Sequence, residues 1–213
     1  EAGPEKPNSK RVGSVILKEC MKLNISIPEY EKYSVKYGHE SIERSKAKFD
    51  SLPFLYRADT RAPEVIKHNG FIARNPLKLE DAKELVKKIF CCDASILFSH
   101  VSCGADSIGN IFVSTADTPD CMGHFTKENI YVISTEDIHE VHPSKEVLGE
   151  AITRTTKNGL RLYLNAKTLE ETTFIGIRPY EYSGEIIVLT PIPANQVLGV
   201  GNAEDFNSFV TFD

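Results

Sequence analysis

Residues 54–70 read FLYRADTRAPEVIKHNG, a stretch that predicts a strand directly followed by a helix. Its first five residues are apolar apart from Arg57, which is typical of a short buried strand. Thr60 has a side chain suited to a helix N-cap, Pro63 suits the first helical turn, and Gly70 suits the helix end. This pair of elements indicates a fold that contains both strands and helices.

The remaining elements are mostly short strands, and the helices are concentrated in the N-terminal half. Residues 11–48 have the apolar spacing of two helices broken at Pro28, and LEDAKELVKKIF (79–90) is an amphipathic helix. A further helix is predicted over 144–156. Strands bounded by turn residues are predicted over 96–101, 110–115, 130–135, 159–166, 173–179, 184–192 and 195–201. The chain is therefore predicted to be an α+β protein.

The character of the chain changes near Pro53, where the helical pattern gives way to strands. Residues 1–50 are predicted to form an N-terminal helical extension that packs on the main domain, because so short a segment can hardly bury a core of its own. Residues 51–213 are predicted to form that main domain, which has an ordinary size for a single unit.

The composition argues against several classes of function. The chain has 213 residues and a formal net charge of −5, so it is not a general binder of nucleic-acid phosphates. No apolar run approaches the roughly 18 to 20 residues needed to cross a bilayer. The five cysteines include no CxxC pair, and HEVH (139–142) offers two histidines without an evident third ligand. No metal site is predicted.

Arg57 is the most informative polar residue, because it lies inside an apolar strand between Tyr56 and Ala58. An unpaired charge is very costly to bury, so the guanidinium needs an anionic partner. One interpretation is an internal ion pair with Asp59 or with a carboxylate distant in sequence. The other is that the forked guanidinium holds a phosphate or pyrophosphate, for which its shape is well suited.

Four further residues are ambiguous when each is taken alone. Ser114 and Thr115 end a strand, where hydroxyl groups usually satisfy a turn. Glu185 opens the strand EIIVL, where a carboxylate is usually solvated. His100 follows an apolar run, where a histidine is more often structural than catalytic. Their order along the chain, and the residues that flank them, carry more information than any one of them.

In that order they resemble the mono-ADP-ribosyltransferase toxins, a family marked by Arg, then a Ser-Thr-Ser-like motif, then Glu. LYRADTRAPEVIKHNGF (55–71) is similar to the first active-site strand and helix of the cholera, heat-labile and pertussis catalytic chains. SHVSCGADSIGNIFVSTA (99–116) resembles the pertussis chain, in which an active-site His precedes the Ser-Thr motif. IYVISTEDIHEVHPSKEVLG (130–149) resembles the next strand of cholera-like chains, and EIIVLTPIPANQVLGV (185–200) the stretch that starts at the catalytic Glu.

The resemblance implies a fold, an activity and a setting. The fold would be a split β-sandwich around an NAD cleft, with helices packed at the N-terminal side. The activity would be transfer of ADP-ribose from NAD⁺ to a side chain of a host protein, with release of nicotinamide and without a metal. The protein would be secreted from a bacterium, with a delivery subunit or secretion system as a further partner, and would act in the host cytosol. Residues 51–213 would be the catalytic domain.

The resemblance also assigns roles to residues. Glu185 would hydrogen-bond the ribose and stabilise an oxocarbenium-like transition state, Arg57 would grip the pyrophosphate, and Ser114 would brace Glu185. His100 would contact the ribose or a phosphate. The predicted NAD-binding set is Arg57, Ala58, Asp59, His100, Ser114 and Thr115, and the predicted acceptor-side residues are Tyr182 and Ser183.

Two departures from the family pattern bear on the acceptor. Arginine-modifying relatives carry Glu or Gln two residues before the catalytic Glu, whereas this chain carries Ser183, so we expect a Thr, Ser, Cys or Asn acceptor. Residues 150–184 are longer than the matching segment of cholera-like chains and are a candidate target-recognition element. The sequence does not choose between ubiquitin, a G protein and another host regulator as the substrate. It also leaves open an NAD⁺ glycohydrolase with the same site, or an inactive relative that binds a partner.

Overall fold

The structure is a computed structural model that describes residues 14–23, 30, 52–91, 94–95, 111–118, 129–150, 159–179, 184–202 and 209–212. Within these residues the chain is a mixed α and β protein, as the sequence predicts, and its regular structure is divided almost evenly between strands and helices. No helix in this part of the chain is long and apolar enough to cross a membrane.

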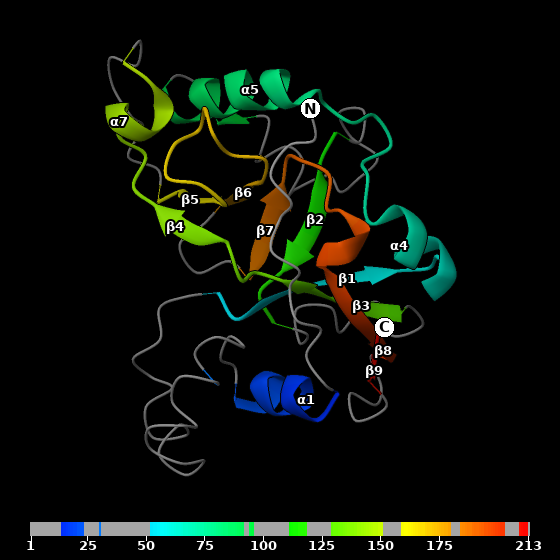
Figure 1. The fold of residues 1–213 in the computed structure, drawn as a ribbon. Helices are drawn as coiled ribbons and strands as arrows, with labels where there is room; N and C mark the ends of the chain where they lie inside the picture. The colour runs from blue at the N-terminus through cyan, green and yellow to red at the C-terminus, as the bar shows by residue number, and fades with distance from the viewer. Residues whose placement is uncertain are drawn as a thin grey trace, which may run out of the picture.

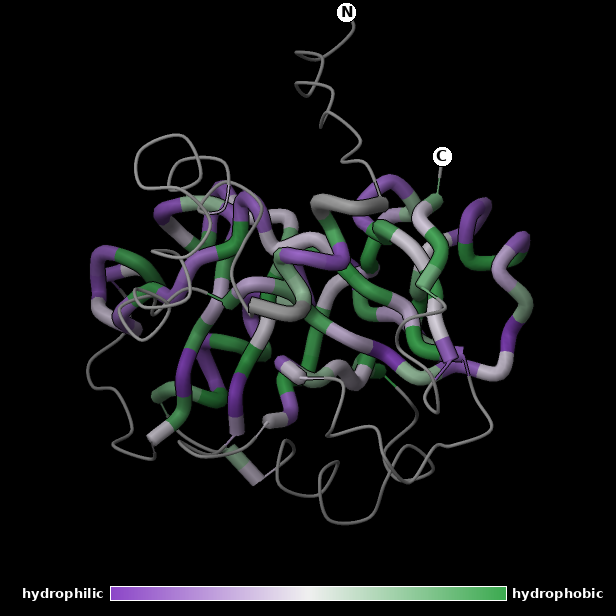
Figure 2. Tube along the Cα trace, turned by 90° about the horizontal axis from the view of Figure 1, so that it is seen from below, coloured by the Kyte–Doolittle hydropathy of each residue, from purple (hydrophilic) through white to green (hydrophobic). Residues whose placement is uncertain are grey.

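The described strands form one nine-stranded antiparallel sheet in the order β4-β5-β6-β7-β2-β1-β3-β8-β9 (Figure 1). The strands are β1 (Phe54–Asp59), β2 (Val113–Ala116), β3 (Asn129–Ser134), β4 (His139–Val141), β5 (Arg161–Leu164), β6 (Ile175–Arg178), β7 (Glu185–Val188), β8 (Val197–Asn202) and β9 (Val210–Thr211). Hydrophobic segments lie along the strands, interrupted by hydrophilic positions (Figure 2).

The pairing between neighbouring strands is shortest in the middle of the sheet, between β1 and β2. These two strands are paired at Tyr56 and Ala116, whereas β1 pairs with β3 along its whole length and β2 does so with β7. In Figure 1, β1 runs across the direction of β2 and β7 rather than alongside them. The joint therefore divides the sheet into a five-strand half, β4-β5-β6-β7-β2, and a four-strand half, β1-β3-β8-β9.

One buried core is shared by the two halves. It receives side chains from both: Val113, Tyr163, Ile186 and Val188 from the five-strand half, and Leu55, Tyr131, Ile133 and Val197 from the four-strand half. Phe71, which follows the short helix α4 (Pro63–Asn69), is fully buried in the same cluster. Burial of this apolar surface is what holds the two halves together beyond the single pairing of β1 with β2.

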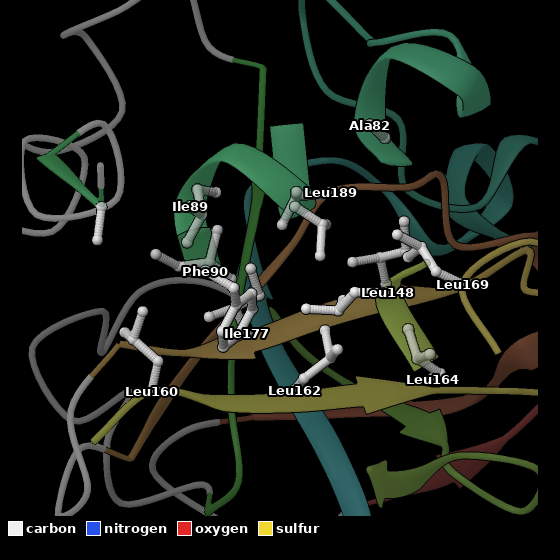
Figure 3. Close-up of a cluster of buried hydrophobic side chains, with 14 of the residues drawn as sticks. Ala82, Ile89, Phe90, Leu148, Leu160, Leu162, Leu164, Leu169, Ile177 and Leu189 are labelled. Carbon is white, nitrogen blue, oxygen red and sulfur yellow. The ribbon is translucent and has the colours of Figure 1, made fainter. Parts of the chain in front are cut away.

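Each half is covered on its other side by a helix. The helix α5 (Leu79–Cys91) packs Val86, Ile89 and Phe90 onto the leucines and isoleucines of β5 and β6 (Figure 3). The short helix α7 (Lys145–Leu148) adds Leu148 to that cluster. At the opposite end of the molecule α1 (Ser14–Leu23) packs on β1 and β3 through Leu17.

Several local predictions are confirmed by the structure, and two are wrong. The helix predicted over 144–156 is α7, which ends at Leu148 because Gly149 follows it at φ 111°. The helix predicted after β1 is α4, with Pro63 in its first turn and Gly70, at φ 64°, at its end. Its N-cap is Ala62 rather than Thr60, because Asp59 accepts a hydrogen bond from the N–H of Arg61 at 3.0 Å and forms the turn before the helix. The predicted helix over 79–90 is α5.

The segment 150–184, predicted to be an insertion, contributes two strands to the sheet. The structure describes 159–179 of it, and β5 and β6 lie there, where strands were predicted. Their buried residues Leu162, Ile175 and Ile177 pack under α5. Two short strands, β4 and β9, have no counterpart among the predicted elements. The predicted strand over 96–101 and nearly all of the predicted second N-terminal helix lie outside the described residues.

Candidate functional site

Arg57 lies in the middle of β1, and its guanidinium is held by two neighbours. Its Nη1 donates a hydrogen bond to the carbonyl oxygen of Ser114 at 2.8 Å, and its Nε lies 3.3 Å from Oδ2 of Asp59. The group also lies over the ring of Phe71, 5.5 Å from the ring centroid. The ion pair that burial demands is therefore made with Asp59, and the side chain remains 26% exposed.

Asp59 is the buried centre of a larger charge cluster. Its carboxylate accepts hydrogen bonds from Nε of Arg61 at 2.9 Å and from Nη2 at 2.7 Å. Burial alone raises the pKa of Asp59, but the hydrogen bonds from Arg61 and the charges of Arg57 and Arg61 outweigh it and hold the pKa below its ordinary value. Asp59 was predicted to bind the cofactor; here its carboxylate orients two guanidinium groups.

Arg61 is a residue of this site that the sequence analysis did not single out. Its guanidinium lies over the same Phe71 ring as that of Arg57, at 5.6 Å from the centroid, and 39% of its side chain is exposed. The hydroxyl of Tyr131 donates to the carbonyl oxygen of Arg61 at 2.6 Å and fixes the turn. The signal available in the sequence was a second arginine four residues after Arg57.

Ser114 and Glu185 meet on neighbouring strands. Ala116 of β2 pairs with Glu185, the first residue of β7, so Ser114 lies diagonally across from that carboxylate on the same face. The Ser114 hydroxyl donates a hydrogen bond to the Glu185 carboxylate. The family resemblance implied that Ser114 braces Glu185, and the two residues lie on the same face of neighbouring strands. Together with the bond from Arg57, Ser114 connects β1, β2 and β7.

The Glu185 carboxylate is partly withdrawn from water. Burial raises its pKa, the Ser114 hydrogen bond lowers it, and burial is the larger of the two, so the pKa lies above its ordinary value. A half-buried, hydrogen-bonded carboxylate of this kind is suited to stabilising a positive charge in a bound molecule.

This balance makes a prediction about Ser114. Ser114→Ala removes the contact that favours the ionised carboxylate, so we expect the midpoint of the Glu185 titration to rise further. A pH titration of side-chain carboxyl carbons by NMR measures the midpoint directly. Ser134→Ala is the matched control, since Ser134 also lies in a strand but its Oγ accepts from the N–H of Glu136. A midpoint unchanged by Ser114→Ala would contradict the contact.

Thr115 and Ala58 were also predicted to contact the cofactor. Thr115 is fully buried, and its Oγ1 donates to the carbonyl oxygen of Ile186 at 2.8 Å, so its hydroxyl cross-links β2 and β7. Ala58 is half-buried and packs at the edge of the core between α1 and β1. The other predicted site residues, His100, Tyr182 and Ser183, lie outside the described part of the chain.

Two cavities lie away from Ser114. One of about 410 Å³ is lined by Asn69, Ile72, Asn165, Thr173, Phe174, Pro191, Ile192, Pro193 and Gln196. The other, of about 230 Å³, is lined by Glu140, Val141, His142, Pro143, Leu160 and Arg161. Neither is lined by Arg57, Ser114 or Glu185. Among the described side chains no group of three or more His, Cys, Asp and Glu is arranged to hold a metal ion.

The described contacts join three of the predicted site residues: Arg57 donates to the backbone carbonyl of Ser114, and the Ser114 hydroxyl donates to Glu185. Asp59 and Arg61 form the charge cluster that orients Arg57. A scan against models of known protein families finds no match to this chain, and neither does a search of the curated proteins.

Proposed function

We propose that this protein transfers ADP-ribose from NAD⁺ to a side chain of a host protein, with release of nicotinamide. The observation that carries the proposal is the connection made at Ser114. Its carbonyl oxygen accepts from Arg57 and its hydroxyl donates to Glu185, so three residues predicted from separate motifs belong to one hydrogen-bonded set. Arg57 and Ser114 are 57 residues apart in the sequence, and Ser114 and Glu185 are also far apart.

The division of the sheet supports the finer proposal of a split β-sandwich with an NAD cleft. The two halves join at Tyr56 and Ala116, and each carries part of the candidate site: Arg57 on the four-strand half, Ser114 and Glu185 on the five-strand half. A ligand bound at the joint would touch both halves. Sites at the meeting of two structural units are a common place for ligand binding.

Glu185 would act on the ribose. Cleavage breaks the bond between ribose C1′ and the nicotinamide nitrogen, whose electron pair leaves with nicotinamide, and positive charge develops on C1′ and the ring oxygen. A carboxylate held beside that sugar stabilises the charge and accepts a hydrogen bond from the ribose. The acceptor side chain then forms the new bond to C1′ and loses its proton. Ser114 holds the Glu185 carboxylate in place for this step.

Arg57 would bind a phosphate of the same substrate. Its guanidinium is anchored on Ser114, Asp59 and the Phe71 ring, so its orientation is set before a ligand arrives. A pre-oriented guanidinium that holds the part of a substrate away from the reacting carbon lowers the entropy cost of the reaction. The acceptor is proposed to be Thr, Ser, Cys or Asn rather than Arg, because Ser183 stands where arginine-modifying relatives carry Glu or Gln.

The test is incubation of the chain with NAD⁺ labelled in its adenylate part and a host-cell lysate. Transfer predicts label fixed on a discrete protein band, and mass spectrometry of that band identifies the acceptor side chain. Free ADP-ribose with no labelled protein would support the glycohydrolase instead. Intact NAD⁺ after prolonged incubation with lysate would reject both activities and leave the partner-binding relative.

A further inference from the structure

Arg178 is a nearly buried cation that the proposed chemistry does not use. It is the last residue of β6, and 11% of its side chain is exposed. Its Nη1 donates to Oδ2 of Asp117 at 2.8 Å, and its Nε donates to the hydroxyl of Tyr163 at 3.2 Å. The guanidinium also lies over the Tyr163 ring, 5.8 Å from its centroid. These contacts with Asp117 and Tyr163 fix the orientation of the Arg178 guanidinium.

The ion pair between Arg178 and Asp117 spans the strand that carries Glu185. In the sheet β7 lies between β6 and β2; Arg178 ends β6, and Asp117 directly follows β2. The N–H of Asp117 donates to the carbonyl oxygen of Gly184 at 2.9 Å, and Ala116 pairs with Glu185. The pair therefore crosses β7 at the residues where that strand begins.

The ion pair lies on the face of the sheet opposite to the Glu185 carboxylate. Ile177 pairs with Ile187, and continuing that antiparallel register by one residue sets Arg178 beside Ile186. Successive residues of a strand point to opposite faces, so Glu185 points away from Arg178. Any effect of Arg178 on Glu185 would therefore pass through the backbone of β7.

We propose that the Arg178–Asp117 ion pair positions Glu185, by holding the start of β7 so that the carboxylate stays within reach of the Ser114 hydroxyl. Its consequence for catalysis rests on the function proposed above. Its consequence for the Glu185–Ser114 contact does not, and can be measured on the protein alone. When the ion pair is broken, the first residues of β7 are less firmly fixed, and the hydrogen bond between Ser114 and Glu185 weakens.

Among the described residues, a hydroxyl and a phenol belong to strand positions on the same face of the sheet as Glu185. Ser114 of β2 donates to the carboxylate, and Tyr56 of β1 lies in the same row of paired residues. Burial, assisted by the charge of Asp117, raises the pKa of Tyr56, so the phenol is uncharged near neutral pH. Arg178 and Asp117 stand at the other face. The contact that a disturbed β7 would lose is therefore the one to Ser114.

The test is a pH titration of the Glu185 carboxyl carbon by NMR, with the spectrum of Glu185→Gln used for assignment. It compares the wild type with Arg178→Gln and Asp117→Asn. If the ion pair acted on Glu185 only through its electric field, the two variants would shift the midpoint in opposite directions, because one removes a positive charge and the other a negative charge. Positioning predicts that both raise the midpoint, as loss of the Ser114 hydrogen bond does.

Three further variants sharpen this comparison. Arg161 is the register partner of Arg178 on β5, but its side chain is 42% exposed and pairs with Glu140 at 3.4 Å, so Arg161→Gln should leave the midpoint unchanged. Arg178→Lys keeps a positive charge beside Asp117 but loses the fork that also reaches Tyr163, so it should restore the wild-type midpoint in part. Adding Arg178→Gln to Ser114→Ala should shift the midpoint little beyond Ser114→Ala alone, because both changes break one contact.

Activity gives an independent readout. We expect Arg178→Gln to lower kcat for NAD⁺ cleavage by about 10-fold to 10²-fold with KM for NAD⁺ unchanged, since a displaced carboxylate affects the transition state more than binding. Should Arg178→Gln fail to fold, Asp117→Asn decides alone, because a raised midpoint there cannot come from a lost negative charge. Opposite shifts, or none, overturn the positioning role. A wild type that leaves NAD⁺ intact overturns the proposed function, while the titration still decides the positioning.

Discussion

Glu185→Gln is expected to lower the rate of NAD⁺ cleavage by about 10²–10³-fold or more, because glutamine keeps the shape of the side chain and removes the charge that stabilises the developing oxocarbenium ion. The loss should fall on kcat, with KM for NAD⁺ changed little, since the contact is strongest in the transition state. Initial rates of nicotinamide release, measured over a range of NAD⁺ concentrations, separate the two parameters.

A matched control uses a carboxylate outside the site. Glu136 is exposed in the turn after β3, and Glu136→Gln makes the same chemical change there, so we expect wild-type rates. Near-wild-type cleavage by Glu185→Gln would remove Glu185 from the mechanism.

The same substitution should stabilise the fold. Because burial raises the pKa of Glu185 above its ordinary value, folding favours the protonated form, and the ionised form costs stability at every pH above the folded-state pKa. Glutamine carries no charge to desolvate. The Tm of Glu185→Gln should therefore exceed that of the wild type at neutral pH, and the difference should vanish as the pH falls below the ordinary pKa of a glutamate. Thermal unfolding at several pH values measures this.

Gly70→Ala is expected to have the largest effect on stability, a loss of about 4 kcal/mol or more. Gly70 ends α4 at φ 64°, and a Cβ there would lie 2.1 Å from the carbonyl oxygen of Ile192 and 2.7 Å from the N atom of Ala194. Both are backbone atoms that cannot turn away. Relief of the clash would break the paired hydrogen bonds, each 2.9 Å long, that join Phe71 to Ile192.

The control for Gly70→Ala separates the clash from the backbone conformation. Gly149 also has a positive φ, 111°, but a Cβ added there meets no atom within 4 Å. Gly149→Ala should therefore cost only the conformational strain, about 1–3 kcal/mol. Chemical denaturation of both variants gives the two free energies of unfolding. Equal losses would contradict the close approach of Gly70 to Ile192. Because Phe71 lies under Arg57, Gly70→Ala should also disturb the candidate site.

Much of the fold could be predicted wherever the signal is local. The amphipathic spacing of 79–90 predicted α5, and Pro63 and Gly70 bounded α4. The N-cap was missed because the turn before α4 is made by Asp59, whose carboxylate takes the N–H of Arg61, and not by Thr60. The strands β4 and β9 were missed because each is very short and exists only through its pairing with β5 or β8.

The sequence by itself determined the types of most elements and the residues able to carry charge chemistry, because helix spacing, turn residues and a charge inside an apolar strand are properties of neighbours in the chain. Only the tertiary structure decided that the Ser114 hydroxyl faces Glu185, that the Arg57 guanidinium ends on the Ser114 carbonyl, and that Arg61 shares Asp59. Those contacts depend on which strands pair and in what register. A shift of one residue between β2 and β7 would turn either side chain to the opposite face of the sheet, and no local signal specifies that choice.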